Sequence, residues 1–210
     1  MVRAIFKGVI LVIPILVVSV TDAATPKPIW AQSVEEIASR VNKVRAGDDL
    51  TPQQWPGGKK VAVSLSFDVD TEPVWMGFQG QSSPSYMSRG EYGARAGMPR
   101  IMELLEKHKI PATFFIPALS MELHPQVVPM IQKNPRNEIG FHSYAHENPM
   151  TLTPEQERAT YAKAMEIFLR HTGKRPTGFR SAAWDLTEST ISIVQEMGFV
   201  YESSMMADDR

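Results

Sequence analysis

From about residue 60 onward, the pattern of apolar and polar positions changes repeatedly between two spacings. Short apolar runs typical of buried strands are followed by stretches with apolar residues three and four apart, the spacing of an amphipathic helix. The predicted strands cover residues 61–67, 112–118, 138–143, 177–184 and 199–205. The predicted helices cover residues 98–109, 124–134, 153–173 and 188–198. Alternating strands and helices predict an α/β fold with a parallel sheet covered by helices.

The helix predicted for residues 153–173 has the clearest boundaries. Thr153 can cap its first turn with Gln156 as the capping-box partner, and Pro154 suits the first helical position. Gly173 supplies a stop signal at the other end.

Residues 71–93 interrupt this alternation with a long connection rich in glycine and serine. A connection of that length inside a compact domain is usually functional or disordered. Because it follows the first predicted strand, we expect it to form one wall of a binding cleft.

The beginning of the chain has a different pattern. Arg3 and Lys7 flank the start of an apolar stretch over residues 8–20, and small residues follow it. A membrane-spanning helix needs about 20 apolar residues, and this stretch is shorter. We therefore predict an export signal peptide over residues 1–23, with cleavage after Ala23. An uncleaved membrane anchor and a buried N-terminal helix are the alternatives.

The rest of the chain is predicted to have two parts. Residues 24–59 form an N-terminal extension with a short helix near 34–44 and a loop that ends at Gly57 and Gly58. Residues 60–210 form the main domain.

Composition limits the possible chemistry. The chain has 210 residues and a formal net charge of −1, so it has no basic footprint for a nucleic acid. It contains no cysteine, which excludes disulfides, thiolate metal ligands and a cysteine nucleophile.

A pair of carboxylates follows the first predicted strand. Asp68 and Asp70 project to the same side if the strand continues, because strand side chains alternate between faces. Like charges held close push their pKa values apart, and a cation bound by one of them removes that conflict. An exposed turn with two acids is the alternative.

Two histidines follow the third predicted strand. His142 and His146 are four residues apart, which places both imidazoles on one face if the segment is a helical turn. Gly140 and Pro149 bracket a predicted strand-to-loop turn here, and neutral imidazole is a favoured zinc ligand. One buried and one exposed histidine is the alternative. We expect three other histidines to be solvated, namely His108, His124 and His171.

An arginine interrupts the fourth predicted strand. A buried arginine must be paired, and the acidic pair is the available partner for Arg180; a solvated arginine is the alternative. In parallel α/β folds ligands bind at the carboxyl ends of the strands, where these groups would meet. One carboxylate and two imidazoles form a three-ligand site with an open position, typical of catalytic zinc. The second carboxylate could take a proton from water activated by the metal, which predicts hydrolysis of an amide or ester.

Three segments of the sequence together resemble a known family. "SFDVD", "HSYAH" and "FRSAAW", in this order, resemble the first three motifs of the NodB-homology polysaccharide deacetylases, over about residues 60–210. The form of the motifs is most similar to the branch with peptidoglycan deacetylase-like and allantoinase-like proteins. The resemblance implies a distorted, incomplete (β/α) barrel. It also implies an exported hydrolase that removes acetyl groups from an N-acetylated (or O-acetylated) polysaccharide, such as peptidoglycan or a chitin-like glycan.

The resemblance further implies a role for each matching residue. Asp68 would be the catalytic base, Arg180 would hold Asp68 ionised, and Trp184 would form a wall of the substrate cleft. The ligands of a divalent metal ion, expected to be zinc, would be Asp70, His142 and His146.

The chain departs from the family pattern in two respects. The third motif lacks the proline that usually precedes its aromatic residue. The last two family motifs, which include a general-acid histidine, would lie beyond Arg210. We therefore expect a barrel truncated at the C-terminal side, with weak or no activity and marginal stability for residues 24–210 alone. Two other functions remain open, an allantoinase-like hydrolase of a small cyclic amide or ureide, and a non-catalytic protein that binds a glycan or metal. Export favours the polymer, and no membrane insertion is expected after signal cleavage.

Overall fold

The structure, a computed structural model, describes residues 27–42 and 52–206. The chain forms two compact units, Met1–Arg45 and Ala46–Arg210. The predicted signal peptide, residues 1–23, lies outside the described residues, and the extension predicted for residues 24–59 stays a prediction. Among the helices of the described residues, none combines the length and the apolar character needed to cross a bilayer.

The described part of the first unit contains one short helix. Helix α1 spans Val34–Val41 and follows a 3-10 turn, η1, at Ile29–Ala31. The side chains of Ser33 and Glu36 form a capping box at its start. The helix predicted near residues 34–44 is therefore present.

The second unit is built on a five-stranded parallel sheet. The strands are β1 (Ser66–Asp68), β2 (Thr113–Ile116), β3 (Glu138–Phe141), β4 (Gly178–Phe179) and β5 (Tyr201–Glu202). They lie side by side in the order β1-β2-β3-β4-β5, and every pair is parallel. This sequential order confirms the predicted α/β fold and corresponds to part of a (β/α) barrel.

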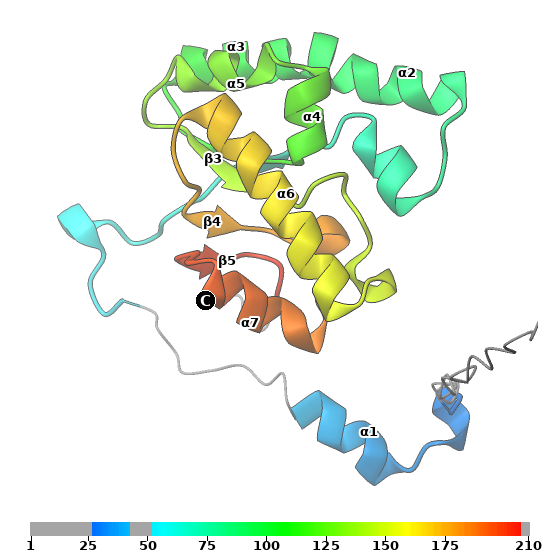
Figure 1. Cartoon of the computed structure of the whole chain (residues 1–210). Coiled ribbons are helices and arrows are strands. Elements are labelled where there is room, and N and C mark those ends of the chain that lie inside the picture. The colour runs from blue at the N-terminus through cyan, green and yellow to red at the C-terminus, as the bar shows by residue number, and fades with distance from the viewer. Residues whose placement is uncertain (1–26, 43–51, 207–210) are drawn as a thin grey trace, which may run out of the picture. The chain divides into compact units, whose positions relative to one another are not determined.

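Helices connect the successive strands (Figure 1). The α-helices of this unit are α2 (Pro84–Tyr92), α3 (Met98–His108), α4 (Ala118–Leu123), α5 (Val127–Gln132), α6 (Pro154–Thr172) and α7 (Glu188–Glu196). The 3-10 and π turns are η3 (Pro56–Gly58), η4 (Val74–Phe78), η5 (Gly93–Gly97), η6 (Pro149–Thr151) and η7 (Ala182–Trp184). In Figure 1, α6 lies in front of the sheet, α7 lies below β5, and α3 and α5 run along the top.

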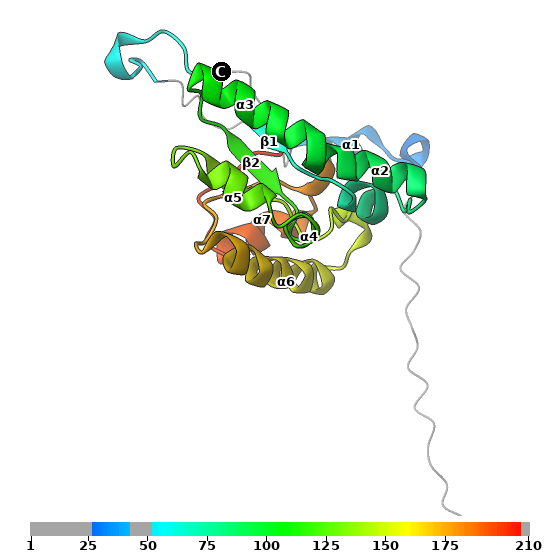
Figure 2. The same ribbon diagram turned by 90° about the horizontal axis from the view of Figure 1, so that it is seen from above.

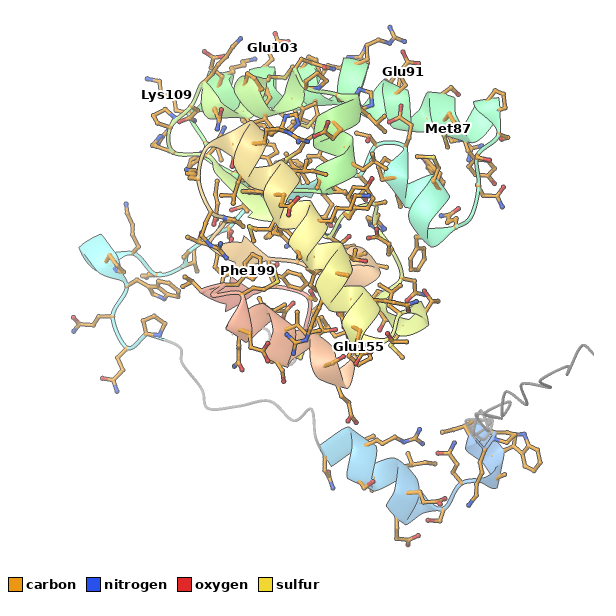
Figure 3. The ribbon with its side chains drawn as sticks, in the orientation of Figure 1. Met87, Glu91, Glu103, Lys109, Glu155 and Phe199 are labelled. Carbon is orange, nitrogen blue, oxygen red and sulfur yellow. The ribbon has the colours of Figure 1, made fainter. Side chains whose placement is uncertain are left out.

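The core lies between the sheet and these helices. Phe141 and Phe179 from neighbouring strands stack with ring centroids 6.1 Å apart. Phe199, labelled in Figure 3, lies 5.2 Å from the Phe141 ring, and Tyr161 of α6 lies 5.9 Å from it. Buried aromatic pairs of this kind stabilise the packing of helices on the sheet.

Helix α6 has the boundaries that the sequence predicts. Thr153 accepts a hydrogen bond from the main chain of Gln156, whose side chain bonds back to Thr153, with Pro154 in the first turn. Gly173 ends the helix in the left-handed conformation with φ of 75°.

The first strand is shorter than predicted. A buried strand over residues 61–67 was expected, but β1 begins at Ser66, and Val61 and Val63 are 72% and 80% exposed. Among the described strands β1 pairs only with β2. The preceding residues therefore have one possible partner strand at most and remain uncovered.

Residues 71–93 are largely helical, with non-helical backbone at 71–72 and 79–83, so the expectation of one long irregular connection is wrong. Turn η4 is followed by α2, which continues through η5 into α3 as one helical stretch over residues 84–108 (Figure 2). Ser83 caps this stretch at the main-chain N–H of Tyr86, and Pro84 occupies its first turn.

The fourth predicted strand, residues 177–184, is also shorter in the structure. Strand β4 ends at Phe179, and turn η7 follows with Ala183 and Trp184 both at φ of 55°. Two successive left-handed residues cannot continue a strand. The backbone thus turns sharply after β4.

Candidate metal centre

The ends of three strands carry the predicted site residues. Asp68 is the last residue of β1, His142 directly follows β3, and Arg180 directly follows β4. These positions lie at the carboxyl edge of the sheet, where parallel α/β folds bind ligands.

The three predicted metal ligands lie together. Nε2 of His142 is 3.4 Å from Oδ1 of Asp70, and Nε2 of His146 is 3.5 Å from Oδ2 of Asp70. One ligand atom from each residue lies within 4.8 Å of the others. The two shorter separations are long for hydrogen bonds, but they match the spacing of about 3.4 Å between two ligands that are each about 2.1 Å from a tetrahedral ion.

The polar atoms of this cluster fit a cation. Oδ1 of Asp70 and Nε2 of His142 are buried, and neither has a hydrogen-bond partner among the described residues. Burying a polar atom without a partner is costly, and nearly all such atoms in proteins are paired. A divalent ion between these atoms would satisfy both, so Asp70, His142 and His146 form a candidate metal centre.

Main-chain contacts orient His142. Its Nδ1 lies 2.7 Å from the carbonyl oxygen of Arg180. A carbonyl can only accept, so Nδ1 donates, and in the neutral imidazole Nε2 keeps its lone pair toward Asp70. This is the usual arrangement by which a second hydrogen bond orients a metal-binding histidine.

The two histidines do not share a helical face, contrary to the prediction. They lie on an irregular turn in which Ser143 and His146 both have φ of 58°. The main-chain N–H groups of Ala118 and Leu119 donate to the carbonyls of Ser143 and Tyr144 at 3.1 and 2.8 Å. These bonds to the start of α4 fold the turn, so that His146 reaches the same acid as His142.

The surroundings shift the pKa values of two cluster members. Burial by itself raises the pKa of Asp70, but the adjacent His142 and the charges of His146 and Arg180 outweigh it and hold that pKa below its ordinary value. Burial lowers the pKa of His146. Both shifts favour the protonation states that bind a metal, namely an ionised carboxylate and a neutral imidazole.

Asp68 is held by an arginine that is itself fixed on several sides. Nη1 of Arg180 donates to Oδ1 of Asp68 at 2.7 Å, and the Arg180 and Asp68 side chains are only 13% and 17% exposed. Nη2 and Nε of Arg180 donate at 3.0 Å to the hydroxyls of Ser66 and Ser203. The guanidinium carbon also lies 4.1 Å from the centroid of the Phe115 ring, a cation–π distance.

Gly140 makes room for the ring of Phe115. It lies within β3, inside the strand predicted for residues 138–143, and a Cβ there would come to 2.5 Å from the Phe115 ring. The missing side chain therefore leaves room for the ring that supports Arg180.

The two acids line a cavity together with Trp184. It has a volume of about 220 Å³ and is lined by Asp68, Asp70, Val74, Phe78, Gln79, His146, Ala183 and Trp184. Trp184 is 56% exposed, so its ring stands at the opening. The Phe78 ring meets the His146 ring edge-on with centroids 6.0 Å apart. A larger cavity of about 530 Å³ between α3 and α5 is lined by none of the predicted site residues.

The other histidines are only partly as expected. His108 is exposed, but Nε2 of His124 lies 2.7 Å from Oε2 of Glu72 and both side chains are largely buried. His171 bonds to Glu122 at 3.0 Å. The prediction of solvated histidines is thus confirmed for His108 and wrong for His124 and His171, because their partners Glu72 and Glu122 are distant in sequence.

Sequence reasoning missed most of the residues that support the site. Ser66 could have been found, because it lies two positions before Asp68 and so on the same face of the strand. Phe115 and Ser203 carry no local signal, because only the pairing of strands brings them to Arg180.

Known proteins resemble most of this chain. Residues 58–201 match the family model of polysaccharide deacetylase. The chain is 35% identical over 152 residues to a peptidoglycan deacetylase of Helicobacter pylori, an alignment covering 72% of this chain and 52% of that protein. The chain thus spans about half the length of this relative.

Solved structures agree with this match. A protein of Mycobacterium smegmatis assigned to the polysaccharide deacetylases superposes with a TM-score of 0.69 and 30% identity, covering 79% of this chain and 57% of that one. PuuE allantoinase superposes with a TM-score of 0.64 and 28% identity, covering 74% and 57%. The region matched by the family model contains the acid pair, the two histidines and Arg180. On the family model and the identity to the Helicobacter pylori protein, the chain belongs to the polysaccharide deacetylase family.

Proposed function

We propose that this protein is a metal-dependent hydrolase that removes acetyl groups from an N-acetylated (or O-acetylated) polysaccharide. The observation that carries the proposal is that two neighbouring acids have different partners. Asp70 faces two histidines, whereas Asp68 faces Arg180, and both acids line the same cavity.

Asp70, His142 and His146 would hold the metal, for which we propose zinc. A divalent ion bound there supplies Lewis acidity, which makes water a stronger nucleophile and an acetyl carbonyl a better electrophile. The two imidazoles and one carboxylate match the ligand types of catalytic zinc sites.

Asp68 would act as the general base. Its Oδ1 is occupied by Nη1 of Arg180, which leaves Oδ2 to accept the proton of the attacking water. Because Arg180 has further contacts to Ser66, Ser203 and Phe115, the carboxylate is held in one orientation before substrate binds. Such fixed geometry is a large part of the advantage that an enzyme has over free reactants.

An acetylated glycan such as peptidoglycan or a chitin-like polymer is the proposed substrate. The similarity to a peptidoglycan deacetylase supports it, as does the position of Trp184, whose exposed ring at the cavity can lie against a sugar. A small cyclic amide or ureide is the second candidate, supported by the similarity to PuuE allantoinase.

The test uses protein expressed from the complete reading frame, with metal content and acetate release measured on one sample. Asp70→Asn should lose the metal, because a neutral amide is a poor ligand for a cation. Asp68→Asn should keep the metal and lose about 10²–10⁴-fold in rate. Equal loss of metal from both variants, or an active Asp68→Asn protein, would contradict the assignment. Parallel assays with acetylated glycan and with allantoin decide between the two substrates.

We further propose that residues 1–23 direct export and that the mature protein begins near Ala24. The basic start and short apolar stretch of the sequence support this. N-terminal sequencing of material from the cell envelope should find Ala24 at or near the first position, and an intact Met1 would contradict the proposal.

A further inference from the structure

Two turns that carry metal ligands contain strained residues. Thr71, which follows Asp70, has φ of 51°, and His146 itself has φ of 58°. The left-handed region is uncommon for residues other than glycine and is a clear outlier for a β-branched residue such as Thr71. A residue stays in such a conformation only where its surroundings hold it there.

The first of these turns lies against a glycine of α2. A Cβ built on Gly90 would lie 2.3 Å from the main-chain nitrogen of Glu72 and 2.6 Å from the carbonyl carbon of Thr71. Only glycine allows α2 to approach the backbone of the Asp70 turn so closely.

The second turn lies against a glycine of η4. A Cβ on Gly77 would lie 1.8 Å from the carbonyl oxygen of Ala145 and 3.3 Å from the carbonyl carbon of His146. The atoms in the way are again main-chain atoms, which cannot rotate aside as a side chain can.

Helix α4 contacts both turns as well. Ser120 donates to the carbonyl oxygen of Asp70 at 2.7 Å and accepts a hydrogen bond from Thr71 at 3.0 Å. The start of the same helix bonds to the turn before His146, through Ala118 and Leu119. Each strained turn is therefore held by α4 and also by one glycine of the segment 74–97.

We propose that the segment 74–97 positions the metal ligands, with Gly90 acting on Asp70 and Gly77 acting on His146. The inference rests on the proposed metal site and adds that two residues without side chains determine its geometry. This positioning role is separate from the cleft wall that the sequence suggests for residues 71–93.

Gly93 provides a matched control within the same segment. It is helical, with φ of −55°, and a Cβ there would have no atom within 4 Å. Gly93→Ala should leave the site unchanged, and the fold should tolerate it because alanine is the better helix former.

The experiment compares Gly77→Ala, Gly90→Ala and Gly93→Ala with the unmodified protein. Co²⁺ is titrated into metal-free samples while its visible absorption spectrum is recorded, because the spectrum reports ligand geometry as well as binding. Disturbed support of a ligand typically weakens metal binding by about 10–100-fold. We expect that loss and an altered spectrum for Gly77→Ala and Gly90→Ala, and neither for Gly93→Ala.

Hydrogen–deuterium exchange of the metal-free proteins separates local from global effects. Gly77→Ala should speed exchange in peptides that cover residues 144–147, and Gly90→Ala in peptides that cover residues 70–72. Exchange that rises throughout the sheet in both variants would overturn the inference, because the glycines would then serve the fold as a whole.

Two further outcomes distinguish a failure of this inference from a failure of the proposed function. If the unmodified protein binds Co²⁺ and all three variants bind it equally with the same spectrum, the positioning role is wrong and the metal site stands. If the unmodified protein binds no Co²⁺ or zinc, the proposed function fails, and the inference fails with it.

Discussion

Nδ1 of His142 donates a hydrogen bond to the main-chain oxygen of Arg180 across 2.7 Å. The guanidinium of the same arginine holds Asp68 at 2.7 Å. One residue thus contacts a candidate metal ligand through its backbone and the candidate base through its side chain. The two contacts can be separated by mutation, because a substitution changes only the side chain.

Replacing Arg180 by lysine should lower turnover and spare the metal. Lysine keeps the charge but lacks the fork that bonds to Asp68, Ser66 and Ser203 together. We expect the rate constant for acetate release to fall about 10²-fold, the usual cost of misplacing a reacting group by about 1 Å. Metal content should stay at the unmodified level, since His142 keeps its main-chain acceptor. Loss of metal from Arg180→Lys would show that the side chain also supports the ligands.

The two candidate histidine ligands should be needed together. The unmodified protein should bind about one equivalent of zinc, and zinc at 100 times its dissociation constant should raise the free energy of unfolding by about 2.7 kcal/mol. His142→Ala and His146→Ala should each abolish this increase, as measured by thermal unfolding with and without zinc. His108→Ala is the control, because His108 is exposed. A variant of either candidate that keeps the full increase would not have lost a ligand.

Removing the Trp184 ring should weaken the use of a polymer. Trp184 is 56% exposed at the cavity that contains both acids, so its ring is available to be covered by substrate. We expect kcat/KM for an acetylated glycan to fall about tenfold in Trp184→Ala, consistent with the burial of part of an aromatic ring. Trp30→Ala, which removes an 84% exposed ring in the first unit, should leave kcat/KM unchanged. An unchanged kcat/KM in both variants would exclude a role for Trp184 in binding.

A buried acid joins α6 to the start of α7. Glu157 is 1% exposed, and its carboxylate accepts from Tyr161 at 3.0 Å and Thr190 at 2.5 Å. The hydroxyls of Thr187 and Ser189 also donate to it at 3.2 Å. Burial and the charge of Glu157 raise the pKa of Tyr161, which keeps the phenol a donor. Glu157→Ala should lower the free energy of unfolding by about 2 kcal/mol, because it leaves buried hydroxyls without their acceptor.

Glu166→Ala on the exposed face of the same helix is the matched control for Glu157. Its effect should stay within about 0.5 kcal/mol, the usual range for surface substitutions. Denaturant unfolding of both variants measures the difference. Similar values for the two would mean that the buried hydroxyls find other partners in the absence of Glu157.

The sequence by itself determined the features that depend on neighbouring residues. The ends of α6 follow from Thr153, Gln156 and Gly173, whose bonds form within a few positions. Strands and helices have apolar patterns of different period, so their alternation can be recognised in the sequence. That alternation predicts a parallel sheet. Polar groups directly after buried strands, such as Asp68 and His142, stand out because burial there is otherwise apolar.

Tertiary structure alone decided the features that depend on distant segments. Asp68 and Arg180 are 112 positions apart, and Ser203 reaches Arg180 only because β4 and β5 pair. The chain before Ser66 stays exposed for lack of a second neighbouring strand among those described.

The two turns that carry the candidate metal ligands Asp70 and His146 also depend on distant segments. A spacing of four between His142 and His146 fits a helix equally well, and only the bonds to α4 select the irregular turn. Gly77 and Gly90 resemble ordinary loop glycines in the sequence. Their role follows from the main-chain atoms of distant residues that pack against them. No local pattern encodes such an interface, because it forms only once the sheet and its helices have assembled.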